Sequence, residues 1–243
     1  MENLKNKIAV VTGGNSGIGY AAAKELKENG ATVVITGRRK EAIEKAAAQI
    51  NATSFVADQT NLNDIDKLVA EVSSQFGTID ILLINAGISQ FAPIEFMQEE
   101  MFDDIMNVNV KGAYFTLSKF IPYLKENASV ILLSSTSAST PSPNISAYSA
   151  SKAAINAIVK VAALELASRK IRVNAVSPGP VATEIMDKSG IGDTKTQEHI
   201  LSGIPLARFG NPAEIARLIT YLSGSDAAFV TGSEFIIDGG QSI

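Results

Sequence analysis

The sequence predicts an α/β protein with a doubly wound sheet of seven parallel strands. Short apolar runs alternate along the chain with longer helical segments. The runs are almost continuously apolar, which is typical of strands buried on both faces. Strands joined by helical crossovers form parallel sheets. No repeat, charge block or Gly/Ser linker divides the 243 residues, so we expect one domain over residues 1–243.

The first half of the chain supplies four strands and three helices. The apolar runs that predict the strands are Ile8–Thr12, Thr32–Thr36, Thr53–Ala57 and Ile79–Asn85. The intervening segments that predict helices are Ile18–Asn29, Lys40–Ile50 and Leu62–Gln75. The last of these shows the helical period most clearly, because its leucine, isoleucine and valine residues lie on one stripe.

The second half continues the same alternation. Strands are expected at Val130–Ser134, Arg172–Val176 and Glu234–Ile237, and helices at Glu99–Glu126, Tyr148–Ser168 and Pro212–Ser223. The stretch between Pro178 and Pro212 breaks the pattern with several glycines and prolines. Because it follows the carboxyl end of a strand, where open α/β sheets bind ligands, we expect a substrate lid at about residues 184–208. The only histidine, His199, lies in it, as a substrate contact or as an ordinary surface or packed residue.

Composition excludes several classes of protein. Lys and Arg number 21 against 25 Asp and Glu, a net charge of -4, which does not favour a nucleic-acid-binding surface. The absence of cysteine and the single histidine exclude thiolate nucleophiles and Cys- or His-rich metal sites, so no metal is expected. The N-terminus does not resemble a signal peptide, and the apolar runs are too short to span a membrane. We therefore expect a cytoplasmic protein without a membrane partner.

A glycine-rich loop follows the first predicted strand, with the sequence Thr12-Gly13-Gly14-Asn15-Ser16-Gly17-Ile18-Gly19. Glycine at 13, 17 and 19 lets the backbone turn tightly and approach a pyrophosphate. The amide groups at the start of the next helix would then face its negative charge. Between a strand and a helix, such a loop indicates a dinucleotide site.

Two arginines, Arg38 and Arg39, follow the second strand, where an NAD enzyme carries an acidic residue for the ribose 2′-hydroxyl. A guanidinium group can instead hold a 2′-phosphate. We therefore predict NADP(H) as the cofactor, with Arg38 the more important of the two. The alternative interpretation is a solvated arginine pair at the start of a helix.

Tyr148 and Lys152 lie four residues apart in a predicted helix, so they project from the same face. A cation about 4 Å from the phenol, at an effective dielectric constant of about 20, would stabilise the phenolate by about 4 kcal/mol, or roughly three pKa units. Such a tyrosine could act as a general acid or base near neutral pH.

Three further features support this catalytic interpretation. Ser135, at the end of the fifth strand, could bind the same substrate oxygen. Asn109 lies inside a helical segment, where asparagine has no propensity advantage. The alternative interpretation is a buried polar residue satisfied by neighbouring backbone. The small residues of Asn85-Ala86-Gly87, after the fourth strand, would let a ribose pack against the chain.

Over essentially its full length the sequence resembles the short-chain dehydrogenase/reductase family. The matching pieces are Thr12-Gly13 with Gly17 and Gly19, Asn85-Ala86-Gly87, Asn109, Ser135, Tyr148-x-x-x-Lys152, Pro178-Gly179, Thr231-Gly232 and Asp238-Gly239-Gly240. The resemblance implies a single-domain Rossmann fold and hydride transfer between NADP(H) and a carbonyl or secondary alcohol. It also implies a homotetramer.

The resemblance assigns roles to individual residues. Tyr148 would be the general acid or base, Lys152 would lower its pKa and bind the nicotinamide ribose, Ser135 would hold the carbonyl oxygen, and Asn109 would keep a water that links Lys152 to solvent. The cofactor-binding set would be Gly13, Asn15, Ser16, Ile18, Gly19, Arg38, Arg39, Asp58, Asn85, Gly87, Tyr148, Lys152, Pro178, Val181 and Thr183. Two positions depart from the pattern. Gln59 stands where an apolar residue is common, and Asn15-Ser16 where many NADP-preferring members carry a basic residue.

Two alternatives stay open for the function. Within the same family, the frame serves 3-ketoacyl-acyl-carrier-protein reductases, sugar or polyol dehydrogenases and steroid dehydrogenases. A different class of protein would be an NADP(H)-binding sensor without chemistry, which the intact set of Ser135, Tyr148 and Lys152 does not favour.

Overall fold

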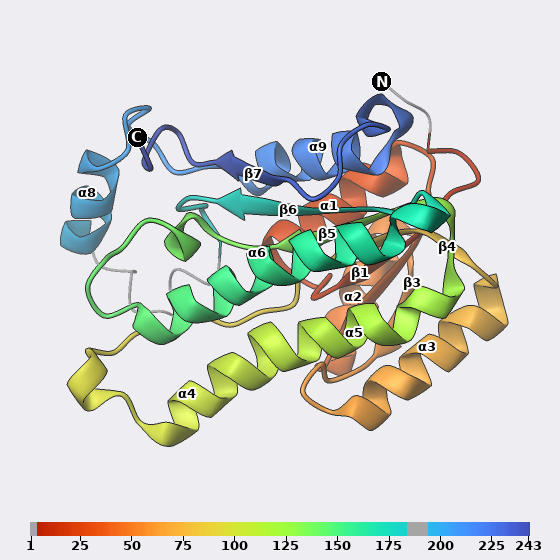
Figure 1. Cartoon of the computed structure of the whole chain (residues 1–243), viewed down its shortest axis with the longest axis horizontal. Coiled ribbons are helices and arrows are strands. Elements are labelled where there is room, and N and C mark those ends of the chain that lie inside the picture. Colours follow the sequence, from red (N-terminus) through yellow and green to blue (C-terminus); the bar gives the residue numbers. More distant parts are fainter. Residues whose placement is uncertain (1–3, 184–193) are drawn as a thin grey trace.

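The computed structural model describes residues 4–183 and 194–243, which form one Rossmann-like domain (Figure 1). In this part of the chain, seven parallel strands make one sheet in the order β3-β2-β1-β4-β5-β6-β7, so the fold prediction is confirmed. The strands are β1 (Ile8–Thr12), β2 (Thr32–Gly37), β3 (Thr53–Val56), β4 (Ile79–Ile84), β5 (Leu124–Leu133), β6 (Arg172–Pro178) and β7 (Glu234–Ile237).

Helices cover both faces of the sheet (Figure 1). One face packs against α1 (Gly17–Glu28), α2 (Lys40–Ile50) and α9 (Pro212–Ser223). The other packs against α3 (Leu62–Phe76), α5 (Ala113–Phe120) and α6 (Ser146–Leu166). The remaining helices are α4 (Glu99–Met106) and α8 (Thr194–Ser202), with short 3-10 turns at Ile94–Phe96, Ile121–Tyr123, Thr136–Ala138, Ala167–Arg169 and Ser225–Ala227. No helix in the described ranges is long and apolar enough to cross a bilayer.

The five inner strands, β2, β1, β4, β5 and β6, contribute to two hydrophobic cores, one on each side of the sheet. Val10 and Leu82 belong to the core beneath α3, α5 and α6, whereas their neighbours Val11 and Leu83 belong to the core beneath α1, α2 and α9. Because successive side chains point to opposite faces, a strand buried on both sides needs apolar residues at every position. This requirement explains the continuous apolar runs in the sequence.

The helix predicted over Glu99–Glu126 is wrong at its end, and it is not α-helical throughout. A π-helical segment, Asn107–Gly112, separates α4 from α5, although the three run on as one rod (Figure 1). The helix ends at Phe120 because Pro122 follows and proline cannot continue a helix. Strand β5 then begins at Leu124, earlier than expected. Its residues 125–127 are polar, and its register against β4 shifts between Ile79 and Ile81, so the sequence of this part does not predict a strand.

The chain reverses its winding direction between β1 and β4, which are neighbours in the centre of the sheet. The loops that follow these two strands therefore diverge and leave a crevice, the usual ligand site of open α/β sheets. Of the predicted lid, residues 184–193 lie outside the described residues. The described remainder begins with α8, which was not expected as a helix.

Candidate active site

The loop between β1 and α1 packs closely against the turn after β4. A Cβ added at Gly13 would lie 2.8 Å from Nδ2 of Asn85 and 2.9 Å from Cα of Ala86, and one at Gly19 would lie 2.3 Å from the Gly13 carbonyl oxygen. Gly13 and Gly17 have positive φ values of 65° and 55°, which glycine adopts without strain. The glycines are therefore required by the packing of the loop, and they also leave its backbone open to a ligand.

Helix α1 begins with free amide groups at the end of this loop. Its N-cap, Ser16, makes no side-chain capping bond, and the first turn, which includes Ile18, carries no acidic residue. Amide groups at a helix N-terminus favour an anion. Asn15 donates a long bond of 3.5 Å to the Ser16 hydroxyl, and its Oδ1 lies 3.1 Å from the position of a Cβ on Gly37. These residues fit the pyrophosphate of a dinucleotide.

The turn after β4 is held from the β1 side by one threonine. The Thr12 hydroxyl accepts bonds from the amides of Asn85 (3.0 Å) and Ala86 (3.1 Å). The Asn85 side chain donates in return to the carbonyls of Thr12 (2.9 Å) and Gly13 (3.1 Å). The side-chain amide of Asn85 is thus bonded to the glycine loop. Its main role here is to join the two walls of the crevice.

The residues Arg38, Arg39 and Asp58, predicted for the adenosine end of the cofactor, follow the neighbouring strands β2 and β3. Arg38 and Arg39 are exposed at the end of β2, and Arg39 is the N-cap of α2 without a capping bond. Asp58 follows β3, and its carboxylate accepts bonds from the amide (2.9 Å) and hydroxyl (2.8 Å) of Thr60. Both arginines are therefore exposed at the edge where a ribose phosphate would lie.

Three of the predicted catalytic residues meet at the carboxyl end of β5. The Ser135 side chain hydrogen-bonds with the phenol of Tyr148. Nζ of Lys152 lies 5.7 Å from the centre of the Tyr148 ring and donates a 2.9 Å bond to the carbonyl of Leu133. The ammonium therefore lies over the phenol ring, where its positive charge favours the phenolate over the phenol.

Burial works against ionisation of both groups. It raises the pKa of Tyr148 above its ordinary value, and the bond with Ser135 offsets only part of this rise. The expected lowering of the tyrosine pKa is therefore absent in the protein without cofactor. Burial also lowers the pKa of Lys152 to about 8, so the ammonium form still dominates at neutral pH. In this state Tyr148 is a phenol ready to donate a proton.

Asn109 lies in the π-helical segment and is buried. Its Oδ1 accepts the amide of Ile88 (2.8 Å), and its Nδ2 donates to the carbonyl of Ile88 (2.9 Å) and to the Ser151 hydroxyl (3.1 Å). Ser151 in turn donates to the Tyr148 carbonyl at 2.7 Å. The side chain is thus satisfied by protein groups, and it connects the turn after β4 to the catalytic helix α6.

The segment after β6 reaches back toward the glycine loop. Pro178 ends β6, Val181 bridges to Gly210, and a Cβ added at Gly17 would lie 3.4 Å from Cγ2 of Thr183. The side chain of Val181 is buried in the core beneath α1, α2 and α9. Any contact of Val181 with a nicotinamide would therefore come from its main chain.

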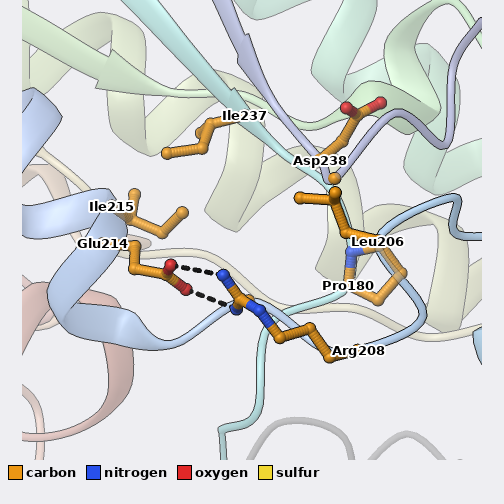
Figure 2. Close-up of a pocket in the computed structure, with 9 residues that line it drawn as sticks. Pro180, Leu206, Arg208, Glu214, Ile215, Ile237 and Asp238 are labelled. Atoms are coloured by element: carbon orange, nitrogen blue, oxygen red, sulfur yellow. Dashed lines mark hydrogen bonds and ion pairs between the residues drawn. The ribbon is translucent and has the colours of Figure 1, made fainter.

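A cavity of about 100 Å³ lies beside this segment, between the end of β7 and the start of α9 (Figure 2). Arg208 and Glu214 face each other across its rim and form a two-pronged ion pair, with distances of 2.8 and 2.7 Å. Glu214 also closes a capping box with Asn211 at the start of α9. None of the predicted catalytic residues lines this cavity. The ion pair therefore fixes the backbone at 208–214 and is separate from the catalytic group.

Sequence reasoning missed two neighbours of Tyr148, the predicted general acid or base. Phe91 packs edge-on against the Tyr148 ring, with centroids 5.9 Å apart and planes at 83°. Ser151, between Tyr148 and Lys152, links the tyrosine backbone to Asn109. The position of Ser151 one residue before the lysine was a usable signal. Phe91 lies in a turn without regular spacing, and nothing in the sequence pointed to it.

Comparisons with known proteins agree with this fold. A family model described as enoyl-(acyl carrier protein) reductase matches residues 13–242. The 3-oxoacyl-(acyl-carrier-protein) reductase FabG of Thermotoga maritima is 36% identical over 99% of both chains. The glucose 1-dehydrogenase of Gluconobacter oxydans is 36% identical over 100% of this chain and 94% of its own.

Solved structures give the same result. A short-chain dehydrogenase/reductase from Serratia marcescens superposes with a TM-score of 0.94 at 30% identity over all of both chains. A 3-ketoacyl-(acyl-carrier-protein) reductase from Brucella melitensis, complexed with NADH, has a TM-score of 0.92 at 35% identity over 99% of this chain and all of its own. A blue fluorescent protein from a metagenomic library, in complex with NADPH, has a TM-score of 0.93 at 26% identity over all of both chains.

A doubly wound sheet with a glycine loop at its switch point and a tyrosine–lysine pair beside it defines a nicotinamide-dependent oxidoreductase. The chain belongs to the short-chain dehydrogenase/reductase family. Membership makes it an enzyme that acts on a CH–OH/C=O pair with a nicotinamide cofactor.

Proposed function

We propose that the protein is an NADP(H)-dependent oxidoreductase that interconverts a small-molecule carbonyl and a secondary alcohol, with Tyr148 as the general acid/base. The observation that carries the proposal is the meeting of Ser135, Tyr148 and Lys152 at the carboxyl end of β5. The bound nicotinamide supplies or accepts the hydride at the substrate carbon, and the protein supplies orientation and the proton.

The chain's own groups account for the proton at the substrate oxygen. In reduction, the Tyr148 hydroxyl donates its proton to the carbonyl oxygen while the Ser135 hydroxyl binds the same oxygen. The positive charge of Lys152 stabilises the phenolate that remains. In oxidation the same phenolate accepts the proton of the alcohol. Asn109 contributes indirectly, because it holds the turn after β4 against α6.

The preference for NADP(H) rests on Arg38, because the end of β2 offers no carboxylate to repel a 2′-phosphate. We expect the wild-type enzyme to oxidise NADPH in the presence of a carbonyl substrate, and Arg38→Ala to raise KM for NADPH at least tenfold while KM for NADH changes less than twofold, since one charge-assisted bond is worth about 1.5–3 kcal/mol. The measurement is the absorbance of the reduced cofactor, with Arg39→Ala as the neighbouring control.

The same assay separates the substrate classes. A panel of 3-oxoacyl thioesters, aldoses, polyols and steroids represents the alternatives, and an enoyl thioester is added because the matching family model is described as an enoyl-(acyl carrier protein) reductase.

Two outcomes would contradict these proposals. An unchanged ratio of the KM values for NADPH and NADH in Arg38→Ala would refute the role of Arg38. Cofactor binding without oxidation over the whole panel would favour a binding protein instead.

We further propose a cytoplasmic homotetramer. Large apolar side chains are exposed on several elements: Phe102 on α4, Leu164 on α6, Phe229 before β7 and Ile236 within it. Exposed apolar patches favour contact with other chains. Light scattering on the protein purified from the soluble cytoplasmic fraction should give four times the chain mass. A mass equal to one chain would contradict the proposal.

A further inference from the structure

Gln59 joins three segments that lie far apart in the sequence. It follows β3, and its Nε2 donates one bond to the carbonyl of Ala86 (3.2 Å) and another to the carbonyl of Val108 (2.9 Å). Ala86 is in the turn after β4, and Val108 is in the π-helical segment, directly before Asn109. One side chain therefore fixes the distance between the turn and the segment.

The amide group contributes donors only. Both partners are backbone carbonyls, which accept bonds and cannot donate them. Oε1 of Gln59 is buried and has no hydrogen-bond partner among the described residues. An apolar side chain of the same length would fill the space but could hold neither carbonyl.

The π-helical segment leaves room for this residue. A Cβ added at Gly112 would lie 2.5 Å from the backbone oxygen of Gln59 and 2.6 Å from its Cγ. Any side chain at position 112 would push the segment away from β3. The absence of a side chain there brings the segment close enough for the bond between Gln59 and Val108.

Asn109 connects the same turn and the same segment. It binds both backbone groups of Ile88, two residues after Ala86. Between these connections lies Gly87, whose added Cβ would lie 3.2 Å from Oδ1 of Asn109 and 3.6 Å from Nζ of Lys152. Movement of the turn relative to the π-helical segment would thus displace Asn109 from its place beside Lys152.

We propose that Gln59 is a positioning residue for catalysis, which acts through Asn109 by holding the π-helical segment against the turn after β4. This inference rests on the proposed function. Gln59 touches neither of the catalytic side chains Tyr148 and Lys152 in the bonds described, so its effect must be transmitted through the backbone. π-Helical turns inside helices often occur at functional sites. A side chain that holds the segment Asn107–Gly112 in place would therefore keep Asn109 in position.

The test is the variant Gln59→Met, which keeps the length of the side chain and removes both donors. We expect kcat to fall about tenfold, as the loss of one or two net hydrogen bonds would allow, while KM for the carbonyl substrate changes less than twofold. The matched control is Gln49→Met. Gln49 is exposed on α2 and accepts a bond from Tyr20, so this variant should retain wild-type kcat.

A double-mutant cycle separates positioning from general stability. In an Asn109→Ala background, Gln59→Met should lower kcat by less than a further twofold, because the residue through which it acts is gone. An equal tenfold loss in both backgrounds, or no loss in the wild-type background, would overturn the inference.

Urea unfolding shows whether each variant is folded. Gln59→Val, which is shorter and also lacks both donors, serves as a second variant and should reproduce the loss of kcat. Loss of cooperative unfolding in both Gln59 variants would also overturn the inference, since the role would then be structural. Failure of the proposed function is distinguishable, because in that case Tyr148→Phe itself would remain active.

Discussion

Tyr148→Phe is expected to lower kcat by a factor of about 10² to 10⁴, the usual contribution of a general acid or base. The substitution removes only the hydroxyl, so the ring keeps its edge-on contact with Phe91. Without the hydroxyl, no group at this position can give a proton to the substrate oxygen. Binding of NADPH, followed by cofactor fluorescence, should stay within about twofold of wild type, because the glycine loop and Arg38 are untouched.

The matched control for this prediction is Tyr20→Phe. Tyr20, on α1, also has a bonded hydroxyl, which donates to Gln49 on α2 at 3.1 Å. This bond does not involve Ser135, Tyr148 or Lys152. This variant should retain wild-type turnover, which shows that loss of a tyrosine hydroxyl is not harmful in itself. Turnover by Tyr148→Phe within a few-fold of wild type would refute the assignment of the acid.

The fold was predictable because the inner strands are buried on both faces, and continuous apolar runs such as Ile81–Ile84 report that burial directly. The boundaries of β5 were not, since Lys125, Glu126 and Asn127 at its start are polar and the strand is irregular there. The π-helical segment was also hidden, because its residues fit an α-helical pattern equally well.

That Ser135, Tyr148 and Lys152 lie together was predictable, because their positions follow local rules. Tyr148 and Lys152 share a helix face, and Ser135 ends a strand. The sequence did not predict the direction of the pKa shift of Tyr148 or the hydrogen bonds between segments far apart in the chain. Burial outweighs the effects that lower the pKa of Tyr148, and the bonds of Gln59 join residues up to 49 positions apart. Both depend on packing that only the folded chain defines.

Lys152→Met is expected to lower the rate of carbonyl reduction about a hundredfold at neutral pH. The substitution removes the cation 5.7 Å from the centre of the Tyr148 ring, and with it the positive charge that stabilises the phenolate left after proton transfer. The phenol would remain protonated, since burial raises its pKa. It would nevertheless be a much weaker acid toward the substrate oxygen.

The pH dependence gives this prediction a second, independent measure. Burial lowers the pKa of Lys152 to about 8, so the ammonium is present below that pH and is lost as the pH rises through it. In the wild type, kcat/KM for reduction, which reports groups of the free enzyme, should therefore fall above about pH 8. In Lys152→Met this fall should disappear, whereas Lys160→Met, at an exposed position further along α6, should keep it. If the fall near pH 8 persists in Lys152→Met, another group titrates there, and the proton transfer depends on that group rather than on the lysine beneath the tyrosine.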